Sequence, residues 1–309
     1  MTTNAACPRS CVALDATAAA LRCESGSLVG VLAEFDGALT AARSERSADD
    51  WRAFVESSVR PHGVRALIHE APFTKRAFEK PRGYPGDAMT LDYIYGTSGL
   101  PPHTTSRGER IFEWERQTDA CRAIRARRDA LAHLLTELTG ADSHARILSV
   151  ACGHLREAQK CAAIREGRFA EFIAFDQDSQ SLKVVADEQG GSGVTPVQGS
   201  VRHILSGKQQ WSQLDLIYSA GLFDYLSDPL ATALAERLFE MLRPGGRLVI
   251  ANLAPDLRNI AYMEALMDWW LVYRNETSLT RLTRPIAERA TSVAVFRCEP
   301  AVALIELTR

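Results

Sequence analysis

Residues 145–160 read Ala-Arg-Ile-Leu-Ser-Val-Ala-Cys-Gly-His-Leu-Arg-Glu-Ala-Gln-Lys, and residues 172–176 read Phe-Ile-Ala-Phe-Asp. The short apolar run 147–151 stops close to a glycine, and good helix formers follow, so the pattern predicts a strand, a tight turn and a helix. The second apolar run ends on Asp176. We interpret the stretch as one βαβ unit, in which Gly153 lets the backbone approach a ligand and Asp176 accepts hydrogen bonds from both hydroxyls of a ribose.

The composition of the turn favours one kind of nucleoside. A pyrophosphate needs several glycines, so that bare amides at a helix N-terminus can close around it, but here His154, Leu155 and Arg156 follow Gly153. NAD and FAD are therefore disfavoured. S-adenosylmethionine (SAM) has an adenosine and no phosphate, and it suits a single-glycine turn. An ordinary turn in a doubly wound sheet is the alternative, and the strands further along the chain argue against it.

Composition and charge limit the class of partner. The 309 residues are 46% hydrophobic, and 36 Lys plus Arg against 38 Asp plus Glu give a net charge of -2. Such a chain has no field that attracts nucleic acid or an anionic membrane, so we expect a small-molecule partner. No apolar run approaches the length of a membrane span and no signal peptide is recognisable, so we expect a cytoplasmic protein. The scattered cysteines give neither a disulfide framework nor a metal-ligand pattern.

The first part of the chain predicts helices only. Apolar residues recur at intervals of three and four between residues 25 and 57 and again between 110 and 138, and no strand pattern appears before residue 140. We therefore expect a helical N-terminal cap over residues 1–140 and a nucleotide-binding domain over 141–309. The basic cluster 122–128 is interpreted as a solvated helix face, because no aromatic residues interleave with it.

A second informative segment lies inside the cap. Residues 80–96 read Lys-Pro-Arg-Gly-Tyr-Pro-Gly-Asp-Ala-Met-Thr-Leu-Asp-Tyr-Ile-Tyr-Gly. The prolines and glycines predict an ordered series of turns, and Asp87 is placed to cap a short helix over 89–95. Tyr84 and Tyr93 offer hydroxyl groups and aromatic faces, and a face can sit against the sulfonium cation of SAM. A role in attaching the cap to the main domain is the structural alternative.

Beyond Asp176, strands and helices continue to alternate. The predicted strands are 194–198, 214–219 and 248–252. The predicted helices are 230–242 and 258–273, and a turn at Arg243-Pro-Gly-Gly follows the first of them. The predicted terminal hairpin comprises 292–296 and 301–307. In open α/β sheets, ligands bind outside the carboxyl ends of the strands, so we expect the loops that follow these strands to converge on one pocket.

These features resemble the class I SAM-dependent methyltransferases over residues 141–309. The resemblance rests on the single-glycine turn, on Leu-Asp-Leu-Ile-Tyr-Ser at 214–219 and on Leu-Arg-Pro-Gly-Gly-Arg-Leu at 242–248. It implies a Rossmann-like α/β fold, a parallel sheet with a C-terminal antiparallel hairpin. Lys-Pro-Arg-Gly-Tyr-Pro-Gly-Asp, Gly-Leu-Phe-Asp-Tyr-Leu and Asp-Trp-Trp-Leu-Val-Tyr-Arg further resemble a bacterial subgroup with a helical cap, often described as forming 3-hydroxypalmitic acid methyl ester, which implies a role in secondary or lipid metabolism.

The resemblance also implies which residues bind SAM. By position, the methionine part would lie on Ala151 and Gly153, the ribose on Asp176 and Gln177, the adenine beside Ser200 and Val201, and the loop after the fourth strand would contribute Ser219 and Gly221. Many members of the superfamily carry an acid where Ser200 stands, so here the backbone would recognise the adenine amine. Arg156 and Glu157 either reach the charged groups of the cofactor or form a surface ion pair.

Two reactions fit this expectation. In methyl transfer, the protein aligns an acceptor with the methyl group and excludes water, and a hydroxyl or amine acceptor needs a base, whereas a carboxyl acceptor does not. The candidate catalytic residues are Tyr84, Asp87, Tyr93, Asp224, Tyr225 and Tyr273. The predicted helix 258–273 carries Trp269 and Trp270, which with Tyr273 could close an apolar chamber.

The second reaction breaks a different bond of SAM. Its own amine attacks the γ-carbon and expels methylthioadenosine, leaving azetidine-2-carboxylate, as in bacterial natural-product enzymes that this chain also resembles. The same tyrosines serve either reaction, so the sequence leaves both open. A module that binds SAM without catalysis is the remaining class, and it ranks last.

Overall fold

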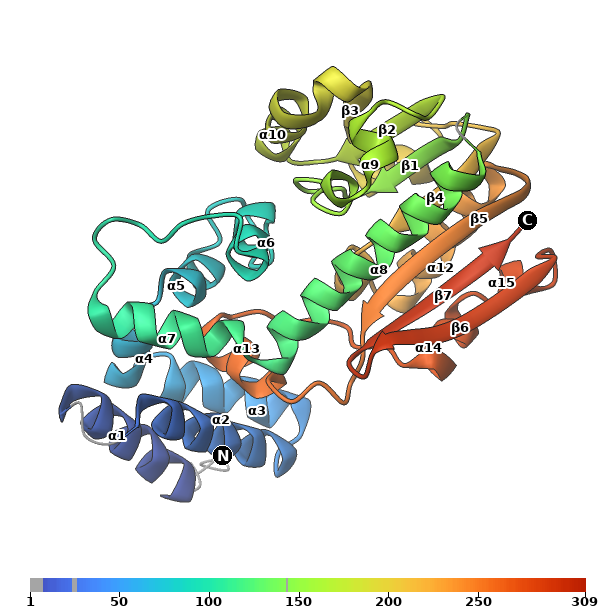
Figure 1. Ribbon diagram of the computed structural model, residues 1–309. Coiled ribbons are helices and arrows are strands. Elements are labelled where there is room, and N and C mark those ends of the chain that lie inside the picture. The colour runs from blue at the N-terminus through green and yellow to red at the C-terminus, as the bar shows by residue number, and fades with distance from the viewer. Residues whose placement is uncertain (1–7, 24–26, 143) are drawn as a thin grey trace. The chain divides into compact units, whose positions relative to one another are not determined.

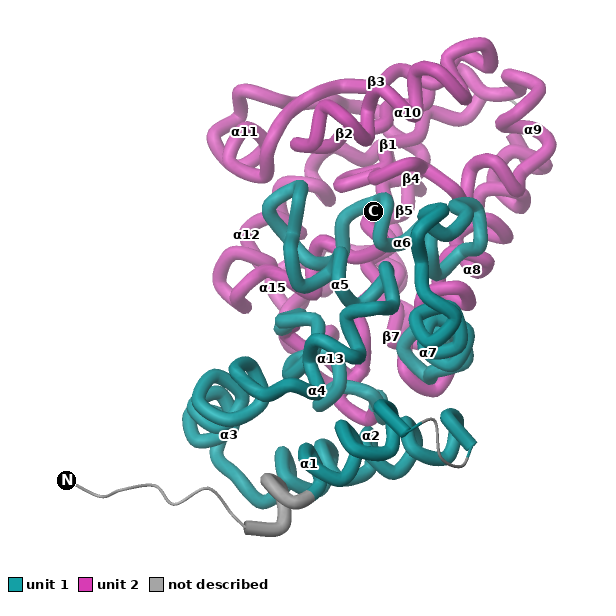
Figure 2. Tube along the Cα trace, turned by 90° about the vertical axis from the view of Figure 1, so that its left-hand side faces the viewer, with its two compact units in different colours: residues 1–122, 257–270 teal, residues 123–256, 271–309 magenta. Residues whose placement is uncertain are grey.

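The computed structural model describes residues 8–23, 27–142 and 144–309. The described residues form two compact units, drawn in different colours in Figure 2. A helical unit comprises residues 1–122 and 257–270, and a sheet unit comprises 123–256 and 271–309. The expected boundary at residue 140 lies near the end of helix α8 (Asp119–Ala141), whereas the division between the units lies inside that helix. A separately folding cap over 1–140 stays a prediction.

The helical unit confirms the predicted absence of strands in the described part of the first 140 residues. Ser27 caps α2 and Ser47 caps α3, and Asp87 caps α6 as its position predicts, each through a side chain that accepts from a backbone amide of the first turn. The elements are α1 (Pro8–Cys23), α2 (Leu28–Ser44), α3 (Ala48–Phe54), a π-helical turn η1 (Val55–Val59), α4 (Gly63–Ile68), α5 (Pro72–Glu79), α6 (Ala88–Tyr95), α7 (Ser106–Arg116) and α13 (Ile260–Leu266).

Residues 257–270 join the helical unit through buried polar contacts that the sequence did not reveal. The carboxylate of Glu264 accepts hydrogen bonds from Arg43 Nε at 2.6 Å and from Trp51 Nε1 at 2.7 Å, which ties α13 to α2 and α3. The hydroxyl of Tyr262 donates to Glu115 on α7 at 2.8 Å. These contacts explain why a segment that follows the last parallel strand folds with helices from the start of the chain.

The sheet unit is built on seven strands in the order β3-β2-β1-β4-β5-β7-β6 (Figure 1). The first five are parallel, and β7 runs antiparallel between β5 and β6, so the predicted parallel sheet with a terminal hairpin is confirmed. The strands are β1 (Arg146–Val150), β2 (Glu171–Asp176), β3 (Val194–Gln198), β4 (Leu214–Ser219), β5 (Leu242–Leu253), β6 (Ser292–Glu299) and β7 (Val302–Thr308).

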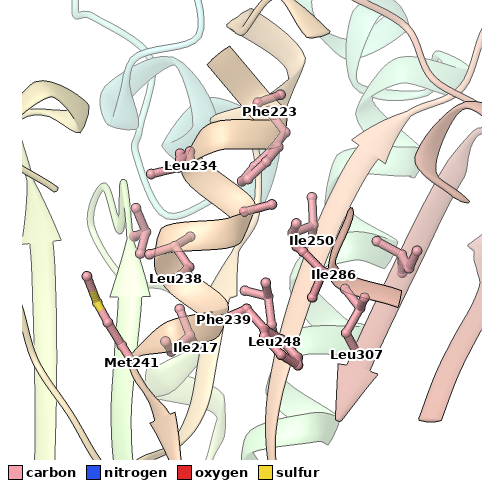
Figure 3. Close-up of a cluster of buried hydrophobic side chains, with 14 of the residues drawn as sticks. Ile217, Phe223, Leu234, Leu238, Phe239, Met241, Leu248, Ile250, Ile286 and Leu307 are labelled. Carbon is pink, nitrogen blue, oxygen red and sulfur yellow. The ribbon is translucent and has the colours of Figure 1, made fainter. Parts of the chain in front are cut away.

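The sheet is held by an apolar core on the side of α12. Leu238 of α12 and Ile286 of α15 gather with the inward side chains of the strands, among them Leu248 and Ile250 of β5 (Figure 3). Leu279 of α14 belongs to the same cluster. All five are completely buried, so the hydrophobic effect fixes these helices on the sheet. The helices of the unit beyond α8 are α9 (Ala162–Arg165), α10 (Ser179–Gln189), α11 (Val201–Leu205), α12 (Asp228–Glu240), α14 (Glu276–Leu282) and α15 (Arg284–Ala287).

Two predicted helices and one predicted turn differ from the structure. The helix expected directly after the first turn is replaced by further turns, a 3-10 turn η2 (Ala158–Lys160) and the short α9. The helix expected over 258–273 ends at Leu266, and Asp268 at φ 47° lies in the left-handed region, which a helix cannot continue through. Trp269, Trp270 and Tyr273 therefore do not share a helix. The turn expected at residues 243–246 lies inside β5, because Leu242 already pairs with Leu214.

Candidate cofactor site

The carboxyl ends of the parallel strands meet at one edge of the sheet unit. Val150 at the end of β1 pairs with Phe175 of β2, and Asp176 pairs with Gln198 at the end of β3. On the other side of β1, Ser219 Oγ at the end of β4 donates to Val150 O at 3.0 Å. The loops after these strands consequently start at the same level, which is the arrangement that forms a ligand site in open α/β sheets.

The loop after β1 has an unusual backbone. Ala151, Gly153 and Leu155 all adopt left-handed conformations, with φ of 56°, 55° and 53°. Two of these residues carry a Cβ, and such positions persist only where the surroundings hold them. Leu155 is completely buried, and Gln189 of α10 donates to Leu155 O at 3.3 Å. The alternating left-handed residues explain why no helix starts directly after Gly153.

Asp176 joins the loops after β1 and β2. Its Oδ2 accepts from Gly153 N at 2.8 Å, and its Oδ1 accepts from Asp178 N at 2.9 Å. The carboxyl group is buried, and burial raises its pKa, while the backbone amides act in the opposite direction. A carboxylate has about four lone-pair positions, so each oxygen of Asp176 retains acceptor capacity beyond its one backbone amide.

A second buried acid lies next to the first turn. The carboxylate of Glu157 accepts from the hydroxyl of Tyr218 on β4 at 2.8 Å, and burial raises the pKa of Glu157. The pKa of Cys152 also lies well above its ordinary value, because the thiol is buried and then because the charges of Asp176 and Glu157 disfavour a thiolate. A nucleophilic role for Cys152 is thus disfavoured. Cys152, Asp176 and Glu157 lie close enough together for the charge of one to affect the others.

Arg127 of α8 places a positive charge near these acidic groups. Its Nη1 donates to Asp224 Oδ2 at 3.1 Å, and its guanidinium group lies so close to Gly221 that an added Cβ would stand 3.2 Å from it. Arg127 is only 4% exposed, so the expectation that residues 122–128 all lie on a solvated face is wrong for this residue. The signal was available: Arg127 lies three residues after Ile124 and four before Leu131, inside the apolar stripe of the helix.

Asp224 is held on both of its oxygens. Besides the ion pair with Arg127, its Oδ1 accepts from Leu253 N at 2.8 Å, and its backbone carbonyl accepts from Val272 N at 2.7 Å. Burial raises the pKa of Asp224 to about 6, against the opposing effect of Arg127. Asp224 therefore connects the loop after β4 with the end of β5 and with the segment that follows residue 270.

Arg274 fastens the same loops from a buried position. It donates through Nη1 to Phe223 O at 2.6 Å and to Asn252 Oδ1 at 3.1 Å, and through Nη2 to Leu226 O at 2.6 Å. The final arginine of Asp-Trp-Trp-Leu-Val-Tyr-Arg thus organises the Gly-Leu-Phe-Asp-Tyr-Leu loop. Both motifs are visible in the sequence, but their pattern does not single out the arginine.

The remaining cofactor candidates lie in the segments that follow β1, β2 and β3. Ser200 is the N-cap of α11 and Val201 is its first residue, directly after β3. Gln177 follows Asp176 and is exposed. Arg156 forms an ion pair with Glu188 of α10, while Glu157 is buried against Tyr218, so the two do not form a surface pair with each other. A contact of either residue with the cofactor stays a prediction.

The candidate catalytic residues are divided between the two units. In the sheet unit, Tyr225 is 38% exposed and neighbours Asp224, and Tyr273 precedes Arg274. In the helical unit, Tyr84 lies in the turns before α6 and Tyr93 lies on α6. A joint role for these residues in one reaction stays a prediction.

Two of the candidates in the helical unit have clear local roles. Asp87 Oδ1 accepts from Thr90 N at 2.8 Å, and its Oδ2 accepts from Arg76 Nη2 at 2.6 Å. The ring of Tyr93 packs edge-on against Phe112, with 5.8 Å between the ring centroids, and burial raises the pKa of its hydroxyl. Asp87 therefore stabilises the turn series as well as the start of α6.

Comparison with known proteins shows what part of the chain resembles. Residues 147–246 match a family described as a methyltransferase domain, and no curated protein matches the chain. Among solved structures, a possible exported protein from Bordetella parapertussis is similar at 16% identity and a TM-score of 0.56, over 86% of this chain and 98% of that chain. Magnesium protoporphyrin IX methyltransferase from Synechocystis PCC 6803 with bound SAH is 11% identical, with a TM-score of 0.47, over 71% of this chain and 91% of that chain.

The strand order and the family match define the class. The sheet unit has the Rossmann-like fold of class I methyltransferases, and the match of residues 147–246 to a methyltransferase-domain family supports SAM as the cofactor. None of the helices in the described ranges combines the length and apolar composition that a membrane crossing requires.

Proposed function

We propose that the protein transfers a methyl group from SAM to a small molecule. The observation that carries the proposal is the position of Asp176, a buried acid at the end of β2 that reaches the amide of Gly153 in the turn after β1. Its remaining acceptor capacity suits the two hydroxyls of the cofactor's ribose, which bind best to a single carboxylate.

The chemistry of the neighbouring side chains also fits SAM. The cofactor carries an ammonium and a carboxylate group at its methionine end, and the site edge holds the carboxylate of Glu157 and the guanidinium of Arg127. We propose that Ala151 and Gly153, in the loop after β1, contact the methionine part. Ser219 and Gly221 would contribute from the loop after β4. Gln177 would assist at the ribose, and Ser200 with Val201 would bind the adenine through the backbone.

The chain's own contribution to the reaction is alignment and exclusion of water. Bound SAM supplies an electrophilic methyl carbon, so the protein has to place the acceptor in line with the bond that breaks. Because Asp224 is buried in an ion pair with Arg127 and also holds Leu253 N, we assign Asp224 to positioning the loop after β4. Tyr84, Tyr93, Tyr225 and Tyr273 remain the proposed sources of a base or of an aromatic face for the sulfonium, and Asp87 is the other proposed base.

The physiological setting belongs to the same proposal. A small hydroxyl, carboxyl or amine compound of bacterial secondary or lipid metabolism is the proposed acceptor, and the cytoplasm is the proposed location.

One experiment separates the proposed reaction from cyclisation of SAM. Purified protein is incubated with SAM alone and with panels of hydroxyl, carboxyl and amine compounds, and the products are identified by mass spectrometry. Methyl transfer predicts S-adenosylhomocysteine only where an acceptor is present. Cyclisation would form the bond from the α-nitrogen to the γ-carbon, break the bond from the γ-carbon to sulfur and release the amine's proton, so methylthioadenosine and azetidine-2-carboxylate would appear from SAM alone and contradict the proposal.

A further inference from the structure

A cavity of about 210 Å³ lies within the helical unit. Its walls come from α2, from the end of α7, from the first residue of α8 and from the two residues before α13. This volume is below the roughly 300 Å³ at which pockets for drug-sized ligands begin, so the cavity suits a smaller molecule.

Asp36 of α2 lines the cavity, and its carboxylate forms no ion pair with any described residue. Asp36 Oδ2 accepts from Asn259 Nδ2 at 2.8 Å, while Asp36 Oδ1 is buried and has no hydrogen-bond partner among the described residues. Burial raises the pKa of Asp36 to about 6, and the nearby charge of Asp119 acts in the same direction. A buried carboxylate oxygen without a donor is costly, so a cationic donor in the cavity would be stabilised there.

The other charges at the cavity are already balanced. Asp119 forms ion pairs with Arg122 and with Arg258 Nε, the latter at 3.4 Å. The side chain of Arg258 is 84% exposed, so it serves Asp119 from the solvent side. Glu115, which follows the cavity residue Trp114 in the chain, is bound to Tyr262 and Thr74, and its pKa of about 8 keeps it neutral at pH 7. The uncompensated charge of the cavity is that of Asp36.

The remaining wall suits an ammonium group rather than a metal ion. Trp114, Gln117 and Thr118 also line the cavity, and an aromatic residue beside polar ones is a lining that accommodates a cation. No group of three or more His, Cys, Asp or Glu side chains with metal-binding geometry occurs in the described part of the chain. An anionic ligand would meet the carboxylate of Asp36, and no unpaired cation lines the cavity to offset it.

We propose that this cavity binds a small aliphatic ammonium compound, with the ammonium group paired with the carboxylate of Asp36. The site is separate from SAM binding, so it can fail or succeed independently of the proposed methyl transfer.

The test measures binding of n-butylammonium and of n-butanol to the full chain by calorimetry. The pair differs in charge and little in size, so a site for a cation binds the amine alone. Asp36→Asn removes the charge and keeps an oxygen for Asn259, and Glu34→Gln on the exposed face of the same helix is the matched control. We expect Asp36→Asn to weaken binding of the amine by at least roughly tenfold, and Glu34→Gln to leave it unchanged.

A second readout does not depend on the variants. Because Asp36 loses its charge on protonation, amine binding to the unsubstituted protein should weaken as the pH falls through about 6. Equal binding of the alcohol and the amine, full binding by Asp36→Asn, or no amine binding at about 10 mM at a pH well above 6 would each overturn the proposal.

Discussion

Asp176 combines a structural and a binding role in one carboxylate. It holds the amides of Gly153 and Asp178 and keeps lone pairs on both oxygens for a ligand. The sequence predicted its position, because an apolar run that ends on an acid is a strong local pattern. It did not predict that the side chain fixes the conformation of the preceding loop, since that contact joins residues 23 positions apart.

Asp176→Ala should weaken SAM binding by about 10- to 100-fold, because it removes hydrogen bonds to a charged group worth about 1.5–3 kcal/mol. The dissociation constant is measured by calorimetry on samples whose fold is checked by circular dichroism. Asp178→Ala is the control: its side chain caps α10, so the variant should lose some helix stability and keep its affinity. Unchanged affinity in Asp176→Ala would remove Asp176 from the cofactor site.

Glu115 gives the folded state a pH dependence. Burial raises its pKa from the ordinary 4.5 to about 8, so the folded protein binds this proton more tightly than the unfolded chain does. The contribution is fully present below pH 4.5 and is lost as the pH rises to about 8, with a slope of about 1.4 kcal/mol per pH unit inside that window.

Glu115→Gln removes this titration while keeping an oxygen for Tyr262 and Thr74. We therefore expect the free energy of unfolding of the variant, measured with urea, to gain on that of the unsubstituted protein as the pH rises from 4.5 to about 8. Parallel pH profiles for the two proteins would show that Glu115 titrates normally.

Arg127 marks the limit of sequence reasoning at the residue scale. Its neighbours in the chain are basic, and that local charge pattern predicted a solvated face. The structure buries it against Asp224 and Gly221, which lie almost a hundred residues further along the chain. A charged residue in an apolar stripe indicates a buried partner, but the partner becomes visible only in the folded unit.

At the element scale, the loop after β4 depends on Arg274. Its guanidinium group donates hydrogen bonds to the buried carbonyls of Phe223 and Leu226. It also pairs, at 2.7 Å, with Asp228, which is the first residue of α12. No apolar contact can replace these bonds, because the carbonyl groups would remain buried without donors. Arg274 therefore holds the loop that carries Asp224 from a second side, in addition to the contacts of Asp224 itself.

Arg274→Gln should lower the free energy of unfolding by about 3 kcal/mol, since it leaves several buried acceptors without a donor. Arg281→Gln is a matched control, because Arg281 also pairs with Asp228, at 3.7 Å, but is 72% exposed. We expect the control to change stability by less than about 0.5 kcal/mol in urea unfolding. Similar losses in both variants would contradict the assigned role of Arg274.

The strands were predicted better than the helices that follow them. β3 and β4 have the predicted bounds, because each is a short apolar or β-branched run between turn residues. The helix predicted directly after β1 does not form, because Ala151 and Leu155 adopt left-handed conformations. Neither residue type indicates such a conformation in a sequence. The helix ending at Leu266 stopped for a similar reason at Asp268, and there the apolar pattern continued beyond the helix.

At the scale of the whole molecule, the sequence separated a helical part from a sheet part but placed the boundary by composition alone. The structure assigns residues 257–270 to the helical unit through Glu264, Tyr262 and Asn259, all of which contact helices from the first 122 residues. Such returns of the chain cannot be read from periodicity, because an apolar helix has the same pattern in either unit.

The central claim is that the edge of the sheet unit at the strand ends binds SAM, and binding of unmodified cofactors tests it most directly. Purified protein is titrated with SAM, S-adenosylhomocysteine and NAD in a calorimeter. The account predicts one binding site for SAM and its product with a dissociation constant below about 100 µM, and no binding of NAD, since the turn at Gly153 lacks the glycines that a pyrophosphate needs. Binding of NAD in preference to SAM, or no SAM binding at about 1 mM by folded protein, would contradict it.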